Sequence, residues 1–376
     1  SNVSRETITD AWAARTTKTY DYTLKDKLVD NRFNRNFLAF EDAYSCSLDD
    51  SARKGVNINV ADFPYLWIFG NGGTGYYPTY TGDTFLIAGS GCIWGGGVSD
   101  YAAVTAIDLR SQSLTTDFTD EFLGKFINLT ELYLQFNLIT SINVSNNISL
   151  QNINLQGNIL SVFDMSALTD LRTLNVNDCS NIEILDISNS LLLTSINARS
   201  NNILIFDASL LSLLTVVNVH SNNISDLNLA NSTNINTIYA YNNNLSTFNA
   251  DDLILLKILS LSINSLTSIS LSNCISITDL YIHTNSLITI DLSALIAANV
   301  LWLYNNQLTT IDISNNVSLI NIRLENNQLT AAANSEILID LDTHGLSNGY
   351  FRSSISGGGT LTTAGLAAKA ALLLKG

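Results

Sequence analysis

The sequence is poor in the residues that build metal centres and disulfide frameworks. Its 376 residues include four cysteines and three histidines. The cysteines lie far apart and form no CxxC pair, which argues against both a zinc site and a disulfide framework: Cys46, Cys92, Cys179 and Cys274. We therefore expect a chain that holds no metal and no cofactor.

Charged residues are also scarce, and long apolar runs are missing. Charged residues make up 14% of the chain and hydrophobic ones 46%, so the chain is expected to fold rather than stay disordered. The net charge of −15 would repel phosphate backbones, which argues against nucleic-acid binding. No apolar run reaches the ~18 residues needed to cross a bilayer, so we expect no membrane insertion.

Residues 1–20 lack the charged-then-apolar layout of a secretory signal. The chain opens on Ser1. Removal of an initiator methionine, a trimmed N-terminus and a cleaved signal would all give this start.

Two motifs in the sequence suggest chemistry but do not fit it, and a third is absent. GNGGTG (70–75) fits GxGxxG, but the following residues include Pro78 and form no helix, so a glycine-rich turn is expected. DLDTHG (340–345) half-mimics a calcium loop, yet His344 and Phe351 replace oxygen ligands there, and a helix C-terminus is expected. No GxSxG elbow is present. We predict that the protein is not an enzyme.

What the sequence does contain is a repeat. From Val104 onward eleven units follow one another, such as LTELYLQFNLI from Leu129 and ANVLWLYNNQL from Ala298. Almost every step is 21 residues, with one step of 22 and a divergent first unit of 25. The units resemble the leucine-rich repeat family, LxxLxLxxN/CxL, and their second halves (LTTIDIS) resemble short bacterial repeats. The resemblance implies an α/β-type solenoid with a parallel β-sheet on the concave face.

The residues explain this pattern physically. Alternating positions such as Leu301 and Leu303 form a short strand whose apolar side chains point inward. An Asn follows where the chain leaves the strand, because an amide can donate to and accept from the backbone there. Cys179 takes this place in the fourth unit, and Gln112 departs from it in the first. The predicted structural Asn/Cys ladder is Asn137, Asn158, Cys179, Asn201, Asn222, Asn243, Asn264, Asn285, Asn306 and Asn327.

The strand positions between the inward residues face outward, and in later units they are aromatic. Rigid aromatic side chains provide a large contact area at low entropy cost, so we predict a binding patch for a host-surface protein or glycan. Aromatic residues also simply suit strands, and that alternative stays open. The amide-rich early units are expected to be solvated sheet surface. The predicted patch is Tyr239, Tyr241, Tyr281, His283, Trp302 and Tyr304.

The two ends of the chain do not repeat. Residues 1–103 are predicted to form an N-terminal capping or docking domain that contacts other virion proteins or a second copy. Residues 104–330 form the solenoid. Residues 331–376 form a C-terminal cap, with one helix closed by Gly345, a glycine-rich loop or hairpin, and a second helix from about Thr363.

The C-terminal tail resembles terminal segments of leucine-rich and fibre-like proteins of phages and their bacterial hosts. This resemblance implies a non-enzymatic phage fibre or surface-decoration protein that contacts the host through the concave face. A secreted or cell-surface bacterial adhesin and a purely architectural virion protein are the alternatives. The expected location is therefore the virion, the cell surface or the extracellular space. Leucine-rich folds bind many unrelated partners, so the fold alone does not decide among these roles.

Overall fold

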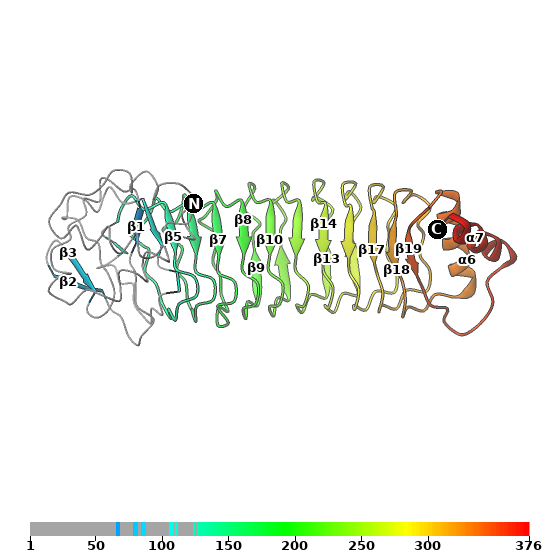
Figure 1. Ribbon diagram of the computed structural model, residues 1–376, viewed down its shortest axis with the longest axis horizontal. Coiled ribbons are helices and arrows are strands. Elements are labelled where there is room, and N and C mark those ends of the chain that lie inside the picture. The colour runs from blue at the N-terminus through cyan, green and yellow to red at the C-terminus, as the bar shows by residue number, and fades with distance from the viewer. Residues whose placement is uncertain are drawn as a thin grey trace, which may run out of the picture.

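The computed structural model describes residues 65–67, 78–81, 84–87, 105–108, 110–111, 123–124 and 126–375 (Figure 1). Most of the proposed N-terminal domain, Gln112, Cys46, Cys92 and the 70–75 turn lie outside these residues. The described part is an elongated stack of turns with two helices at its C-terminal end.

The largest sheet has thirteen parallel strands in the order β1-β4-β5-β6-β7-β8-β10-β12-β14-β16-β17-β18-β19. Eleven of these strands come from the eleven repeats, so the predicted solenoid is confirmed. They are β4 (Ala106–Asp108), β5 (Glu131–Tyr133), β6 (Asn152–Asn154), β7 (Thr173–Asn175), β8 (Ser195–Asn197), β10 (Val216–Asn218), β12 (Thr237–Tyr239), β14 (Ile258–Ser260), β16 (Asp279–Tyr281), β17 (Val300–Trp302) and β18 (Asn321–Arg323).

The two end strands of this sheet come from outside the repeats. β1 (Tyr65–Trp67) pairs with β4, and β19 (Tyr350–Arg352) pairs with β18. The glycine-rich segment between the two C-terminal helices was predicted to be a loop or hairpin, whereas it begins with the last strand of the sheet. The outward side of this sheet is the face that the sequence predicts to be concave, and we call it the concave face. The proposed division at residue 104 stays a prediction.

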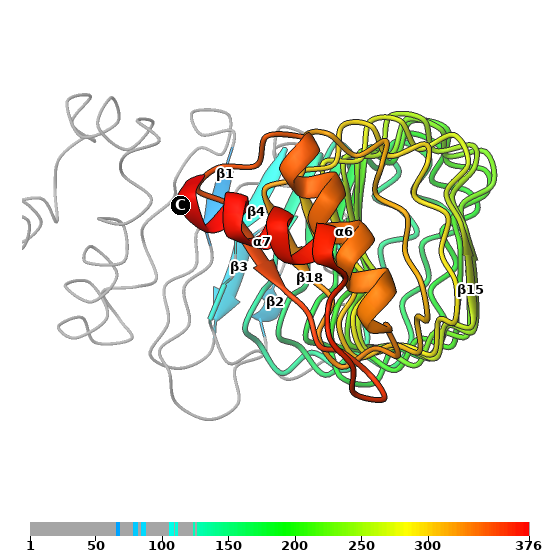
Figure 2. The same ribbon diagram turned by 90° about the vertical axis from the view of Figure 1, so that its right-hand side faces the viewer.

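Short strands also form on the return side of the turns. β9 (Ile205–Asp207) pairs with β11 (Asp226–Asn228), and β13 (Thr247–Asn249) pairs with β15 (Ser268–Ser270). Figure 2 shows β15 on the opposite side of the coil from β18. β2 (Pro78–Thr81) and β3 (Thr84–Ile87) form a separate hairpin. Between residues 126 and 330 the return segments contain turns and strands rather than helices.

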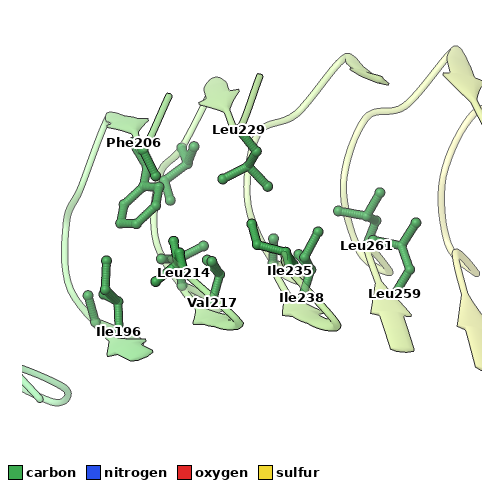
Figure 3. Packing of buried hydrophobic residues seen from close by; sticks show 14 of the residues in the cluster. Ile196, Phe206, Leu214, Val217, Leu229, Ile235, Ile238, Leu259 and Leu261 are labelled. Atoms are coloured by element: carbon green, nitrogen blue, oxygen red, sulfur yellow. The ribbon is translucent and has the colours of Figure 1, made fainter. Parts of the chain in front are cut away.

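The core is a continuous column of apolar side chains between these two walls. Leu301 and Leu303, like their counterparts in other repeats, are fully buried. Figure 3 shows Val217 and Ile238 at one wall and Phe206 near the other. Each turn packs only against its neighbours, so stability comes from the interfaces between turns.

The members of the predicted Asn ladder make a recurring set of hydrogen bonds. In a typical turn, the Asn243 amide nitrogen donates to the carbonyl oxygens of Val219 (3.0 Å) and Ala240 (3.1 Å). Its side-chain oxygen accepts from the Ile224 backbone nitrogen at 2.9 Å. One amide therefore satisfies buried backbone groups in two consecutive turns. The Cys179 thiol donates to the Leu155 carbonyl oxygen at 3.3 Å, and so keeps the hydrogen bond to the preceding turn.

A second ladder on the return side did not emerge from the sequence. Its members are fully buried and alternate with leucine, so a polar or sulfur-bearing side chain appears in every second turn. Ser232 donates to the Ala208 carbonyl oxygen at 2.6 Å, and Cys274 donates to the Ala250 carbonyl oxygen at 3.2 Å. The alternating series reads Asn147, Leu168, Ser190, Leu211, Ser232, Leu253, Cys274, Leu295 and Asn316.

The two described cysteines are thus structural donors. Both are free and buried, and burial raises the pKa of each thiol to about 11. A thiol that keeps its proton at neutral pH can continue to donate to a carbonyl oxygen. Cys179 and Cys274 belong to different ladders.

In each described turn, the residue immediately before the ladder residue has a left-handed backbone conformation, with positive φ. Most members are Asn, Ser, Asp or Gly, but Ile263 has φ 56°. A β-branched residue is strained there, whereas Asn tolerates this region. Ile263 is also 47% exposed, so its replacement removes little burial. We expect Ile263→Asn to raise the unfolding free energy by about 1 kcal/mol in urea denaturation. The reverse change Asn305→Ile should lower it, and equal stability of both variants would contradict the strain argument.

Exposed carboxylates close a turn on the return side of several repeats. In Asp312 the side-chain oxygen accepts from the Ser314 backbone nitrogen at 2.9 Å, and Asp207 does the same with Ser209 at 2.8 Å. Hydrogen bonds from the side chains of Ser314 and Ser209, and then from their backbone nitrogens, lower the pKa of both carboxyls below the usual 3.8. Asn228 and Asn249 stand in the same column and accept in the same way.

A lowered folded-state pKa stabilises the fold above the unfolded pKa, and this stabilisation is lost as the pH falls through the folded pKa. We therefore expect these groups to leave the urea midpoint unchanged above about pH 5. The midpoint should fall as the pH drops below the usual pKa of the carboxyls. The double variant Asp207→Asn/Asp312→Asn keeps the acceptors without a titrating group. Its midpoint should fall less over the same range, and an identical fall would contradict this origin.

Two helices form the predicted C-terminal cap. α6 (Ala331–Thr343) begins after Thr330, whose hydroxyl accepts from the Ala333 nitrogen, and Gly345 lies just beyond its end at φ 74°, as predicted. α7 (Thr363–Lys375) is capped by the hydroxyl of Thr362 rather than Thr363. A methyl group on Gly365 would lie 2.5 Å from the Ser335 side chain, so the helices touch there. Figure 2 shows both helices across the end of the stack.

Candidate binding face

The candidate site is a row of side chains that crosses the middle of the concave face. Strand register places these side chains side by side, because each pairs with its counterpart one turn on. All six residues of the predicted patch are half-buried on this face. The row reads Asn175, Asn197, Asn218, Tyr239, Ser260, Tyr281, Trp302 and Arg323.

Four patch residues form one network, which we call the aromatic cluster: Tyr281, His283, Trp302 and Tyr304. The Tyr281 and Trp302 rings meet edge to face at 5.0 Å between centroids, and His283 stacks on Tyr304 at 4.1 Å. Arg323 lies over the Tyr304 ring at 4.1 Å and is paired with Glu325.

The other two patch residues lie apart from this cluster. Tyr241 stacks on His220 at 4.1 Å, while Tyr239 makes no ring contact with another described residue. Between Tyr241 and the cluster lies the turn of Ser260 and Ser262, which are 7% and 3% exposed. The predicted continuous patch is therefore divided into two parts by a serine turn.

Both histidines are kept neutral by their surroundings. Burial, and then the charge of Arg199, lower the pKa of His220, while burial and the charge of Arg323 lower the pKa of His283. Arg199 is itself paired with Asp178 at 3.1 Å. At neutral pH these stacked imidazoles therefore add hydrogen-bonding groups to the face without adding charge.

The amide-rich strip differs from the solvated surface that its composition suggested. Asn177 is 3% exposed and Gln135 is 7% exposed. Buried amide oxygens of Gln135, Asn177, Asn197 and Asn218 receive no hydrogen bond from any described residue. Asn197 and Asn218 are register partners, and Asn218 pairs directly with Tyr239. The strip thus continues into the aromatic residues.

Several of these residues were missed as site members, although they stand in the same two outward columns as the patch. His220 stacks on Tyr241, and Arg323 lies over the Tyr304 ring. The charge of Arg199 acts on His220 and lowers its pKa. A residue's place in a column does not reveal these interactions. The sequence signal that could have identified these residues is their place in the two outward columns.

The described residues show no candidate metal site at this face. They contain no group of three or more His, Cys, Asp and Glu side chains placed to hold a metal ion. His220 and His283 engage separate tyrosines, in keeping with their distance along the sheet. Within the same residues no helix has the length and apolarity that a membrane span requires.

Solved structures resemble this chain, whereas no family model and no curated protein matches it. A leucine-rich repeat protein of Leptospira interrogans is 21% identical over 74% of this chain and 72% of its own, with a TM-score of 0.62. The internalin InlF of Listeria monocytogenes is 22% identical over 76% and 89%, with a TM-score of 0.59. The functional domain of Listeria InlJ, which includes a cysteine ladder, is 21% identical over 64% and 67%, with a TM-score of 0.51. The chain therefore has the leucine-rich repeat fold.

Proposed function

We propose that this protein is a non-enzymatic recognition module whose concave face binds a partner on another surface. The observation that carries this proposal is the gathering of aromatic rings on one half of the sheet face. Trp302 alone meets Tyr281, His283, Tyr304 and Arg323. Rings that are already held by one another lose little conformational entropy on binding, which is typical of binding hot spots.

We further propose that the partner lies on the surface of a host cell, and that the chain acts as a phage fibre or decoration protein. The tail resemblance and the acidic, repeat-built body support this role. A bacterial surface or secreted adhesin is the alternative, and it is favoured by the bacterial origin of the neighbours from Leptospira and Listeria. The architectural role would leave the concave face without a ligand.

The test is binding of the purified protein to whole bacterial cells from its source community. We expect the parent protein to bind, and the triple variant Tyr239→Ala/Tyr281→Ala/Trp302→Ala to lose at least about tenfold in affinity because hot-spot rings are removed. Tyr133→Ala is the matched control, since Tyr133 stands at the same register position near the other end of the sheet. Circular dichroism checks that each variant is folded. A parent protein that binds no cell, or a triple variant that binds equally well, would remove the support for this role.

A further inference from the structure

We propose that the ligand of the concave face is a neutral, linear carbohydrate chain that crosses the strands from β7 to β17. This inference rests on the proposed function and adds the chemistry of the ligand. Three independent features of the row carry it: the held rings, the unpartnered amide oxygens and the near absence of charge.

The aromatic half provides platforms for sugar rings. Pyranose rings present flat faces of C–H groups, which stack on the faces of Tyr and Trp. Trp302 is fixed in place because its indole nitrogen donates to the Asn321 side-chain oxygen at 3.2 Å. The Tyr281 hydroxyl is similarly fixed by Asp279 at 3.3 Å. One register position recurs on every strand at ~4.8 Å, and a repeating surface of this kind suits a repeating polymer.

The amide half supplies what the hydroxyl groups of such a polymer need. Buried acceptors without a donor are unfavourable, and a ligand that brings donors relieves them once the amide side chain turns toward the face. The oxygens of Asn177, Asn197 and Asn218 lie on three consecutive turns and lack such a donor among the described residues. A hydroxyl group can donate to one of these oxygens and accept from a neighbouring amide at the same time. A purely apolar ligand would leave the oxygens unpaired.

The charge of the face excludes a strongly ionic ligand. The whole protein carries −15, yet the two outward columns between Asn175 and Tyr304 hold just one formal charge, Arg199, with Asp279 beside them on β16. Arg199 is paired with Asp178, and Asp279 accepts from the Thr278 hydroxyl at 2.7 Å. Within these two columns an acidic polysaccharide would find no unpaired cation, and a basic segment would find little to hold it. A neutral polyol is the chemistry that remains.

The experiment uses the full chain on an array of neutral oligosaccharides (glucans, mannans, galactans and N-acetylglucosamine oligomers) and their uronic-acid counterparts. Calorimetry then follows a length series of the best neutral chain. We expect affinity to rise with each added sugar until the row is filled. Binding should be nearly equal at about 50 mM and about 500 mM NaCl, because no ion pairs form with the ligand.

Two substitutions separate recognition from folding. Trp302→Ala should weaken binding about tenfold or more, as loss of a hot-spot ring does. Asn218→Ala should weaken it about tenfold while leaving the protein at least as stable, because the Asn218 oxygen accepts no hydrogen bond inside the protein. Tyr133→Ala again serves as the control and should bind normally. If Asn218→Ala stabilises the protein and binds normally, the amide strip is no ligand site and the proposal falls.

Treatment of the cells distinguishes this inference from the proposed function. Periodate oxidation of cell-surface sugars should abolish cell binding, and protease treatment should not. If protease abolishes binding and periodate does not, the protein is a recognition module for a protein partner, and the carbohydrate inference is wrong. If binding to cells survives the triple aromatic change, the proposed function itself fails.

Discussion

Replacing Asn222 by leucine is expected to lower the unfolding free energy by about 2–6 kcal/mol. One buried N–H loses its only partner at about 1–3 kcal/mol, and two hydrogen bonds to carbonyl oxygens are lost at about 0.5–1.5 kcal/mol each. The Asn222 amide nitrogen donates to the carbonyl oxygens of Ala198 (3.0 Å) and Val219 (2.9 Å). Its oxygen accepts from the Ile203 nitrogen at 3.1 Å. Leucine has a similar volume but leaves the Ile203 nitrogen without its acceptor. The Ala198 and Val219 oxygens each lose one donor and keep another, from Asn201 and Asn243 respectively.

The matched control is the next residue. Asn223 is exposed, so Asn223→Leu should change the unfolding free energy by less than about 0.5 kcal/mol. Urea denaturation measures both variants, and hydrogen exchange locates the loss. Exchange should accelerate in the turns on either side of Asn222, since each turn depends on its neighbours. Equal stability of the two variants would show that the ladder is not required.

The second large effect is expected on the opposite wall. Phe206→Ala should cost about 3–5 kcal/mol, because it leaves a cavity between turns that packing cannot refill. Phe206 is fully buried near the wall formed by β9 and β11 (Figure 3). In this position the neighbouring turns carry Leu185 and Leu227. Phe206→Leu should therefore cost far less than alanine.

Ile205 provides the control for this prediction. It adjoins Phe206 on the same strand but is 60% exposed, so Ile205→Ala should stay within about 1 kcal/mol of the parent. The measurement is again the free energy of unfolding in urea. A Phe206→Ala variant that is as stable as Ile205→Ala would mean that the turns collapse freely onto one another.

The fold was predictable because the same few positions recur eleven times. A single LxxLxLxxN match is weak, but periodic copies identify the inward residues, the Asn ladder and the direction of the sheet. The second ladder was missed for a physical reason. A short donor of any kind reaches the carbonyl oxygens there, so Asn147, Ser232 and Cys274 perform the same task with different side chains. Because leucine occupies every second member, the column is also harder to recognise in the sequence.

The site was predictable only in part. Which residues face outward follows from strand periodicity, and all six patch residues lie on that face. How they group depends on the size of each neighbour. Ser262 is too short to bridge Tyr241 and His283, so the patch divides there. The burial of Asn177 likewise does not follow from its outward position in the strand pattern.

The alternation of the return-side ladder has a consequence for how such a protein can change length. Removing one turn would place two donors, such as Ser232 and Cys274, in adjacent turns, or bring two leucines together. Removing a pair of turns would leave the alternation intact. The modular unit of this scaffold is then a pair of turns rather than a single one. Natural or engineered variants should therefore gain and lose turns two at a time.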